Sequence, residues 1–183
     1  MLNSVAVQER LSPMNRVFRG LAMALAGTGA LIAAQAGAPG AFAQSPRIFV
    51  PGSIEFAVPD KWNAEARGQK MTVVNASEDA FIVFLVLRQE DGPAFKLQLG
   101  KVLASQFEDV AMADEGQKLT VDSTPALALR GSGSSDATPI AFRAVVLMPK
   151  GRAPVMVLAY TTPANFPATD PSFVAVFDSL KVK

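Results

Sequence analysis

Short apolar segments separated by polar ones predict several strands along the chain. Ile54, Phe56 and Val58 alternate with less apolar neighbours, which predicts a strand. Residues 63–69 are polar and predict a connection, and residues 71–74 predict a second strand. The sequence therefore predicts a strand, a connection and a second strand over residues 54–74.

A continuous apolar run fills residues 80–87, directly after a turn-like segment at residues 75–79. The run is too short to cross a membrane and is rich in β-branched and aromatic side chains. A strand with both faces covered has this composition. We therefore expect it to lie centrally in a sheet, with a layer on each side.

Two segments have the apolar spacing of a helix with one buried face. The first lies within residues 95–112, where apolar and charged residues fall on opposite faces. The second is near the C-terminus, where Asp170 can cap a helix, Pro171 suits its first position, and residues 173–180 supply an apolar face.

Further strands complete the pattern. Residues 119–129 are strand-like around a turn at residues 122–125, and residues 131–136 form a loop of Gly and Ser by composition. Residues 140–148 and 155–160 predict an antiparallel hairpin, because only a short connection separates them. The fold class is therefore α+β: an antiparallel sheet of about six or seven strands with helices packed on its faces, an α/β/α sandwich.

The first 43 residues have the composition of an export signal and belong outside the fold argument. Arg16 and Arg19 precede an apolar stretch at residues 21–38 that is rich in Ala and Leu. Because the two arginines are not adjacent, the pattern favours a Sec-type signal over the twin-arginine type. Met14 is a second possible start, and either start gives the same mature protein.

Ala41 and Ala43 supply the small residues of a cleavage pattern, so cleavage leaves Gln44 as the new N-terminus. The mature chain, residues 44–183, is then a single domain in the periplasm or outside the cell, without a membrane span. The alternative is an envelope protein held by an uncleaved N-terminal helix, because the apolar stretch approaches the roughly 20 residues that span a bilayer. Glycines within the stretch and the cleavage pattern after it favour cleavage.

Charge and cysteine content narrow the function classes. Cleavage removes three of the 17 basic and one of the 16 acidic side chains, leaving 14 and 15. A protein that binds nucleic acid through phosphates would show a basic excess, so we expect no nucleic-acid partner. The chain has no cysteine, so the exported domain must be stable without disulfides.

Two phrases near the ends of the mature chain resemble a known superfamily. Residues 56–62 read Phe-Ala-Val-Pro-Asp-Lys-Trp, and residues 173–180 read Phe-Val-Ala-Val-Phe-Asp-Ser-Leu. With the order of elements, they resemble the PsbP/Mog1/DcrB-like superfamily of exported or accessory α/β/α domains. The resemblance implies that fold and a non-enzymatic accessory or binding role, and it carries over no catalytic residues.

The residue types exclude several mechanisms. Without His or Cys the chain has neither a Ser-His-Asp nor a Cys-His nucleophile pair, and it has no ordinary zinc or haem ligands. We expect no metal, no cofactor and no catalytic residues. The alternative is a carboxylate-dependent hydrolase of the cell envelope, in which some of four acidic pairs would converge in a cleft: Glu78-Asp79, Glu90-Asp91, Glu108-Asp109 and Asp114-Glu115.

Four residues make a candidate binding surface. Trp62 lies in an expected loop, where it either docks a ligand or covers the sheet edge. Arg130 and Arg143 lie on neighbouring expected strands, and they either flank a shallow groove or face outwards as solvated charges. Asp136 ends the Gly-Ser loop, which either holds an ion or simply connects strands. The sequence thus predicts an exported, periplasmic or secreted, non-enzymatic accessory protein whose partner is an envelope protein or a small ligand.

Overall fold

The computed structural model describes residues 47–50, 53–89 and 92–183. The predicted export signal and its predicted cleavage residues Ala41, Ala43 and Gln44 lie outside the described residues. The contacts divide the chain into two units, and all the described residues belong to the second, Gly40–Lys183.

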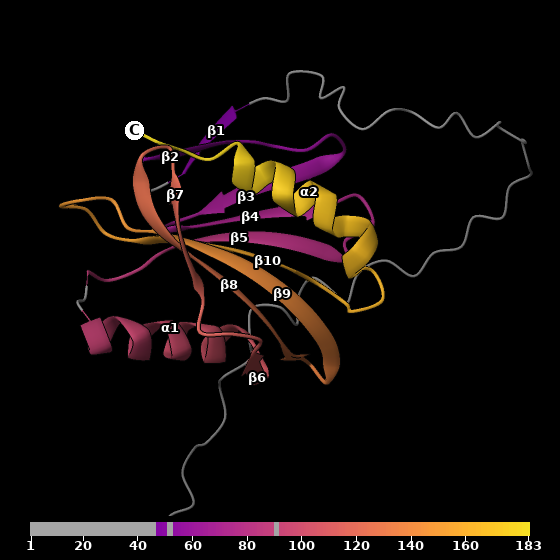
Figure 1. Ribbon diagram of the computed structural model, residues 1–183. Helices are drawn as coiled ribbons and strands as arrows, with labels where there is room; N and C mark the ends of the chain where they lie inside the picture. Colours follow the sequence, from indigo (N-terminus) through magenta and orange to yellow (C-terminus); the bar gives the residue numbers. More distant parts are fainter. Residues whose placement is uncertain (1–46, 51–52, 90–91) are drawn as a thin grey trace, which may run out of the picture. The chain divides into compact units, whose positions relative to one another are not determined.

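The main sheet has eight antiparallel strands (Figure 1). They are β3 (Trp62–Arg67), β4 (Lys70–Asn75), β5 (Ala80–Val86), β6 (Glu108–Met112), β7 (Gln117–Val121), β8 (Thr124–Ser135), β9 (Thr138–Leu147) and β10 (Val155–Thr161). Their spatial order is β3-β4-β5-β10-β9-β8-β6, and β7 also pairs with β8. The predicted antiparallel α+β fold is confirmed, with one or two more strands than expected.

A smaller sheet joins the two ends of the described chain. It contains β1 (Arg47–Val50), β2 (Ile54–Ala57) and β11 (Lys181–Val182), in the order β1-β2-β11. The strand expected from Ile54, Phe56 and Val58 is therefore present as β2, with Ile54 and Phe56 completely buried.

Helices α1 (Gly92–Gln106) and α2 (Phe166–Asp178) cover opposite faces of the main sheet (Figure 1). Each helix has its own hydrophobic cluster: Phe173 and Phe177 of α2 belong to one, and Leu99 and Leu103 of α1 belong to the other. Neither helix is long and apolar enough to cross a bilayer.

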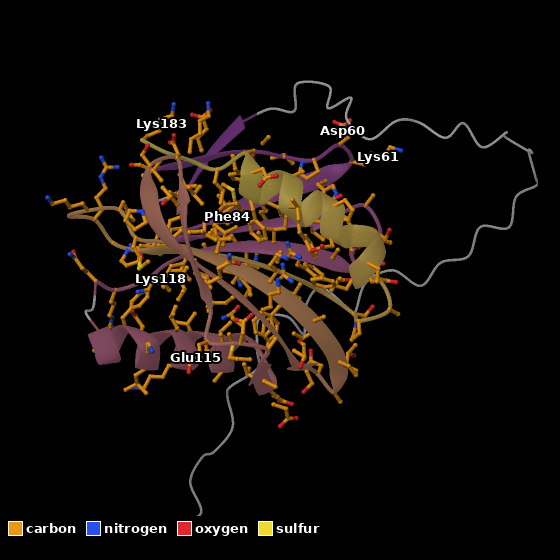
Figure 2. The ribbon with its side chains drawn as sticks, in the orientation of Figure 1. Asp60, Lys61, Phe84, Glu115, Lys118 and Lys183 are labelled. Carbon is orange, nitrogen blue, oxygen red and sulfur yellow. The ribbon has the colours of Figure 1, made fainter. Side chains whose placement is uncertain are left out.

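The apolar run at residues 80–87 is central, as predicted. Strand β5 lies between β4 and β10. Its Ile82 and Phe84 face the cluster of α2, and Val83 faces the cluster of α1. Phe84, labelled in Figure 2, stacks on Phe56 of β2 with ring centroids 4.3 Å apart. Both faces of the strand are covered, which explains why its residues are almost all apolar.

The prediction of a connection at residues 63–69 is wrong. Residues 62–67 form strand β3, which pairs with β4 through a tight turn at Gly68, where φ is +60°. Strand β3 is an edge strand, and most of its residues are exposed. An exposed edge strand need not be apolar, so its sequence resembles a loop.

The first helix ends earlier than predicted. It stops at Gln106, and residues 108–112 form strand β6. The Phe107 N–H donates to the Leu103 carbonyl at 2.9 Å, and Asp109 then has a φ of +50°, which no α-helix allows. Val110 nevertheless packs on the cluster of α1. The apolar spacing that predicted a helix therefore extends by coincidence over residues that form a strand.

The Gly-Ser segment at residues 131–136 was predicted as a loop and is instead mostly strand. Strand β8 continues to Ser135, and the turn is Asp136-Ala137, with φ values of +49° and +62°. Two such residues in succession form a two-residue hairpin turn. A Cβ on Gly131 would lie 2.5 Å from the Ala111 carbonyl oxygen, so this glycine permits the close approach of β6.

The second helix begins earlier than predicted. Asn165 stands at the N-cap, Pro167 lies in the first turn, and Asp170 and Pro171 lie inside the helix. The prediction failed because Pro167, four residues upstream, suits a first turn equally well. Asp170 has a different role, described below.

Candidate functional site

Two of the four residues of the candidate binding surface lie side by side. Arg130 of β8 and Arg143 of β9 are direct partners across the two strands. Both line an open groove of about 540 Å³ between α2 and the outer strands, here called the α2 groove. Its wall and floor include Leu119, Ala128, Arg130, Arg143, Val145 and Phe177. Trp62 and Asp136 do not line it.

Strand alternation directs the two arginines to the face that α2 covers. Ala126 belongs to the cluster under α2, and Arg130 lies four residues further along β8, on the same face. Val145 belongs to that cluster too, and Arg143 lies two residues before it on β9. The groove is thus the part of this face that α2 leaves uncovered.

Arg143 is fixed by an ion pair with α2. Its Nη2 lies 3.0 Å from Oδ2 of Asp170, and the two side chains are only 18% and 28% exposed. The Nε of Arg143 and the Oδ1 of Asp170 are buried and have no hydrogen-bond partner within the described part of the chain. The pair anchors the helix over β9 and balances the charge of Arg143.

Arg130 is different because its guanidinium remains available. The residue is exposed, and it forms no ion pair with any residue in the described ranges. A guanidinium presents a planar fork of N–H donors that suits a carboxylate or phosphate. In the α2 groove, Arg130 is therefore the group best placed to meet an acceptor on a ligand.

Carboxylates line other parts of the α2 groove. Asp114, Asp122 and Asp178 contribute to it. Asp114 accepts a hydrogen bond from the Gly116 N–H at 2.8 Å, and Asp122 accepts one from the Val182 N–H at 2.9 Å. Each of these two carboxylates thus already holds a turn or the C-terminal strand. The groove combines a cationic wall with acidic groups.

Trp62 covers the core in this structure. The side chain is partly buried and meets Phe173 of α2 edge-on, with ring centroids 6.1 Å apart. The Trp62 N–H donates to the Pro59 carbonyl at 3.1 Å, which closes a turn in which Lys61 has a φ of +64°. Asp136 lies in the exposed two-residue turn between β8 and β9. Three strands of the main sheet, β4, β5 and β10, separate β9 from β3, which carries Trp62.

Two of the four acidic pairs line the same groove, and a third lies elsewhere. Glu78-Asp79 lies in the turn before β5, and Glu90-Asp91 lies outside the described residues. Glu108-Asp109 and Asp114-Glu115 line a second groove on the α1 side, and all four of these residues are exposed. Within the described ranges, no group of three or more acidic residues is arranged to hold a metal ion.

The sequence did not reveal that residues of α2 and β7 would help to line the α2 groove. Val174, Phe177 and Asp178 were expected only as part of a helix, and Leu119 and Val121 only as part of a strand. No local signal marks them, because their place in the groove depends on how β7 pairs with β8 and on where α2 lies in the fold.

Solved structures from several organisms share this architecture. Cyanobacterial PsbP (CyanoP) from Synechocystis sp. PCC 6803 matches with a TM-score of 0.57 at 13% identity, over 80% of this chain and 98% of that one. The Ran-binding protein Mog1p of Saccharomyces cerevisiae gives 0.51 at 11% identity, over 75% and 94%. The chain has the PsbP/Mog1-like fold.

A third PsbP/Mog1-like match is LpqN, described as involved in cell envelope biogenesis of Mycobacterium tuberculosis. It gives a TM-score of 0.50 at 18% identity, over 75% of this chain and 90% of that one. No protein-family model matches the chain, and no curated protein matches it. The resemblance expected from residues 56–62 and 173–180 is therefore confirmed for the fold.

The two phrases meet in this PsbP/Mog1-like domain. Ser179, at the end of α2, accepts a hydrogen bond from the Ala57 N–H at 2.9 Å and donates one to the Val176 carbonyl at 2.8 Å. Trp62 packs on Phe173. The residues that carry the resemblance therefore join the last helix to the first strands, which is a structural role.

Proposed function

We propose that the chain is exported and cleaved after Ala43, and that residues 44–183 act as a periplasmic or secreted accessory protein. In this proposal the domain is not an enzyme. It binds an envelope protein or a small ligand in the α2 groove. The observation that carries the proposal is the exposed guanidinium of Arg130 beside the neutralised Arg143 in an open groove.

The dimensions and chemistry of the α2 groove support binding. Its volume of about 540 Å³ lies in the range of sites that hold small molecules. Arg143 is held by Asp170, so the groove has one rigid charged wall before any ligand arrives. Arg130 supplies donors for a carboxylate or phosphate of the ligand, and Asp114 and Asp178 favour a cationic group elsewhere in it.

The chemistry of the chain favours binding over catalysis. The sequence offers neither a histidine nor a cysteine for proton transfer or nucleophilic attack. A hydrolase based on carboxylates needs an acid that stays protonated near neutral pH, and such acids are withdrawn from water. The carboxylates of the α1-side groove are all exposed.

The structural neighbours support an accessory role. One of them is a Ran-binding protein, and another is involved in cell envelope biogenesis. This supports a domain that binds another molecule. The export signal that the composition of residues 1–43 predicts would place the chain with a partner in the cell envelope.

The binding site is tested by affinity capture from an envelope fraction. Wild type, Arg130→Glu and Lys150→Glu are compared, and recovered partners are then titrated as purified components. Lys150 is the matched control because it is exposed and lines neither groove. We expect a partner or ligand that binds wild type and Lys150→Glu equally and Arg130→Glu at least about tenfold more weakly. Equal binding to all three, or no binding by wild type, contradicts the proposal.

Export is tested separately by locating the protein and sequencing its N-terminus. We expect the chain outside the cytoplasm with Gln44 as its first residue. A full-length chain in the membrane fraction would support the uncleaved anchor instead, and an intact chain in the cytosol would reject export.

A further inference from the structure

A second groove lies on the α1 side of the sheet. It has a volume of about 720 Å³ and runs between α1 and the strands β6 and β8. We call it the α1 groove and define it by Leu99, Leu103, Phe107, Met112, Leu127 and Leu129. Leu127 and Leu129 alternate along β8 with Ala128 and Arg130 of the α2 groove, so the two grooves lie on opposite faces of the sheet.

The floor of the α1 groove is apolar. Leu103, Phe107 and Leu129 are almost completely buried and belong to the cluster under α1. On the helix wall, Gly100 has no atom within 4 Å of the place where a Cβ would stand. The helix therefore leaves an open trough above a hydrophobic base.

One of the two exposed large hydrophobic side chains in the described ranges lines the α1 groove, and the other lies on α1 outside its lining. Among the described residues, the large hydrophobic side chains that are exposed are Leu97 of α1 and Met112 of β6. Met112 is 41% exposed and lines the groove. Strand β6 is also an edge strand of the main sheet. An apolar contact would remove Met112 from water and is therefore favourable.

The rim of the α1 groove is strongly acidic. Glu108, Asp109, Asp114 and Glu115 line it, whereas Lys96 is its one basic residue among those described. Figure 2 labels Glu115 beside α1, in agreement with its place in this groove. The mature chain as a whole is nearly neutral. The negative charge is thus concentrated around the apolar floor.

These features together select a partner. An apolar floor within an acidic rim complements a segment that carries bulky apolar side chains flanked by Lys or Arg. We propose that the α1 groove docks a cationic amphipathic segment of another protein. The apolar side chains of the segment enter the trough above Leu103 and Phe107, and its basic side chains meet Glu108 and Glu115.

The probe is a short synthetic peptide, acetylated and amidated, in which pairs of lysines alternate with pairs of leucines. Protein isolated from cells that express the full chain is titrated with it by calorimetry at low salt, and NMR shift changes locate the site. Two matched peptides replace the leucines by serine or the lysines by glutamate. We expect the parent peptide to bind and to shift resonances of α1 and β6, and both replacements to remove most of the binding.

The variants separate charge from apolar contact. We expect Glu108→Lys with Glu115→Lys to weaken the affinity about tenfold, because two exposed pairs become repulsive. We expect Met112→Gln to weaken it about fivefold through lost apolar burial. Glu65→Lys is the charge control on β3, at the opposite edge of the main sheet, and should bind normally. Melting curves check that each variant is folded.

Several results would overturn the docking proposal. They are the absence of binding at about millimolar peptide, equal binding by the serine peptide, equal losses in Glu65→Lys, or self-association of the protein through Met112. Arg130→Glu separates the two grooves, because it should leave peptide binding intact. A loss in Arg130→Glu alone would place the peptide in the α2 groove and reject the α1 groove.

Discussion

Gly131 allows two strands and an aromatic ring to approach each other at one point. A Cβ there would lie 2.5 Å from the Ala111 carbonyl oxygen and 2.5 Å from a ring carbon of Phe142. Neither neighbour can yield easily, because one is backbone and the other is a fully buried ring. The glycine is therefore a packing requirement, although its sequence context suggested a flexible loop.

Substitution of this glycine should destabilise the domain. We expect Gly131→Ala to lower the free energy of unfolding by about 1–3 kcal/mol through overpacking. Gly100→Ala is the matched control: it lies in α1 with free space around it and should stabilise by about 0.5–1 kcal/mol. Urea unfolding followed by Trp62 fluorescence measures both changes. Equal midpoints for the two variants would refute this account of Gly131.

Tyr160 is a buried phenol in the cluster under α1. Its ring stacks on Phe81 at 5.2 Å and meets Phe107 edge-on at 4.9 Å between centroids. Burial raises the pKa of Tyr160 to about 12, from an ordinary value of 10.0. Between these values the unfolded chain loses the phenolic proton and the folded chain keeps it.

Stability should therefore fall as the pH rises from about 10 to 12, and Tyr160 should supply part of that fall. With about 1.4 kcal/mol for each pKa unit, the contribution reaches about 2–3 kcal/mol at pH 12. In Tyr160→Phe this part is absent, so its free energy of unfolding should depend less on pH over the same range. Other groups, including the partly buried Lys70, cancel in the comparison. Parallel pH profiles for the two proteins would show that Tyr160 does not contribute.

At the scale of elements, burial determined what the sequence could predict. Strand β5 and the β9–β10 hairpin were predicted because strands covered on both faces are apolar along most of their length. Strands β3 and β6 were missed because they lie at the edges of the main sheet and are mostly exposed. Both helices were found from their apolar faces, but their ends depend on local turns that several residues could have formed.

The end of α2 depends on one side chain. The hydroxyl of Ser179 bonds to the Ala57 N–H of β2 and to the Val176 carbonyl of the helix. We expect Ser179→Ala to cost about 1–2 kcal/mol of stability, because the Ala57 N–H loses this partner. Ser105→Ala, at the end of α1, is the control because its hydroxyl bonds only within its own exposed helix end, and it should change stability by less than about 0.5 kcal/mol. Thermal melting of both variants decides, and a control that loses as much as Ser179→Ala would contradict the role.

At the scale of the whole domain, the last three residues connect the two sheets. The Val182 N–H donates to Asp122 in the turn between β7 and β8, and the Lys183 N–H donates to the Ser53 carbonyl. The Lys183 ammonium lies 3.0 Å from Glu55, a carboxylate on β2 that is only 9% exposed. These contacts attach the smaller sheet to the larger one.

Removal of residues 181–183 should therefore lower the free energy of unfolding by about 2–4 kcal/mol. Lys183→Met keeps the backbone bonds and removes only the charge, so its loss should be clearly smaller. Calorimetric melting of the two proteins against wild type makes the comparison. If the truncated protein melts like wild type, the C-terminal strand has no role in joining the sheets.

The candidate site was only partly predictable from the sequence, because the grooves depend on how distant segments of the chain are placed. Neighbouring strands for Arg130 and Arg143 followed from the order of apolar segments, and the structure pairs the two residues directly. The grooves themselves depend on where α1, α2 and β7 stand relative to a strand of 12 residues. Such long-range placement leaves no local pattern in the sequence. For this reason Trp62 and Asp136, although predicted as part of the same surface, line neither groove.

Alternate residues of strand β8 contribute to two different grooves. Positions 128 and 130 belong to one groove, and positions 127 and 129 belong to the other. Point mutations can therefore change either surface alone, whereas inserting or deleting one residue in this strand would exchange arginine for leucine on both faces at once. In this segment of the gene, evolution can adjust each groove by substitution but can hardly alter the length of the strand.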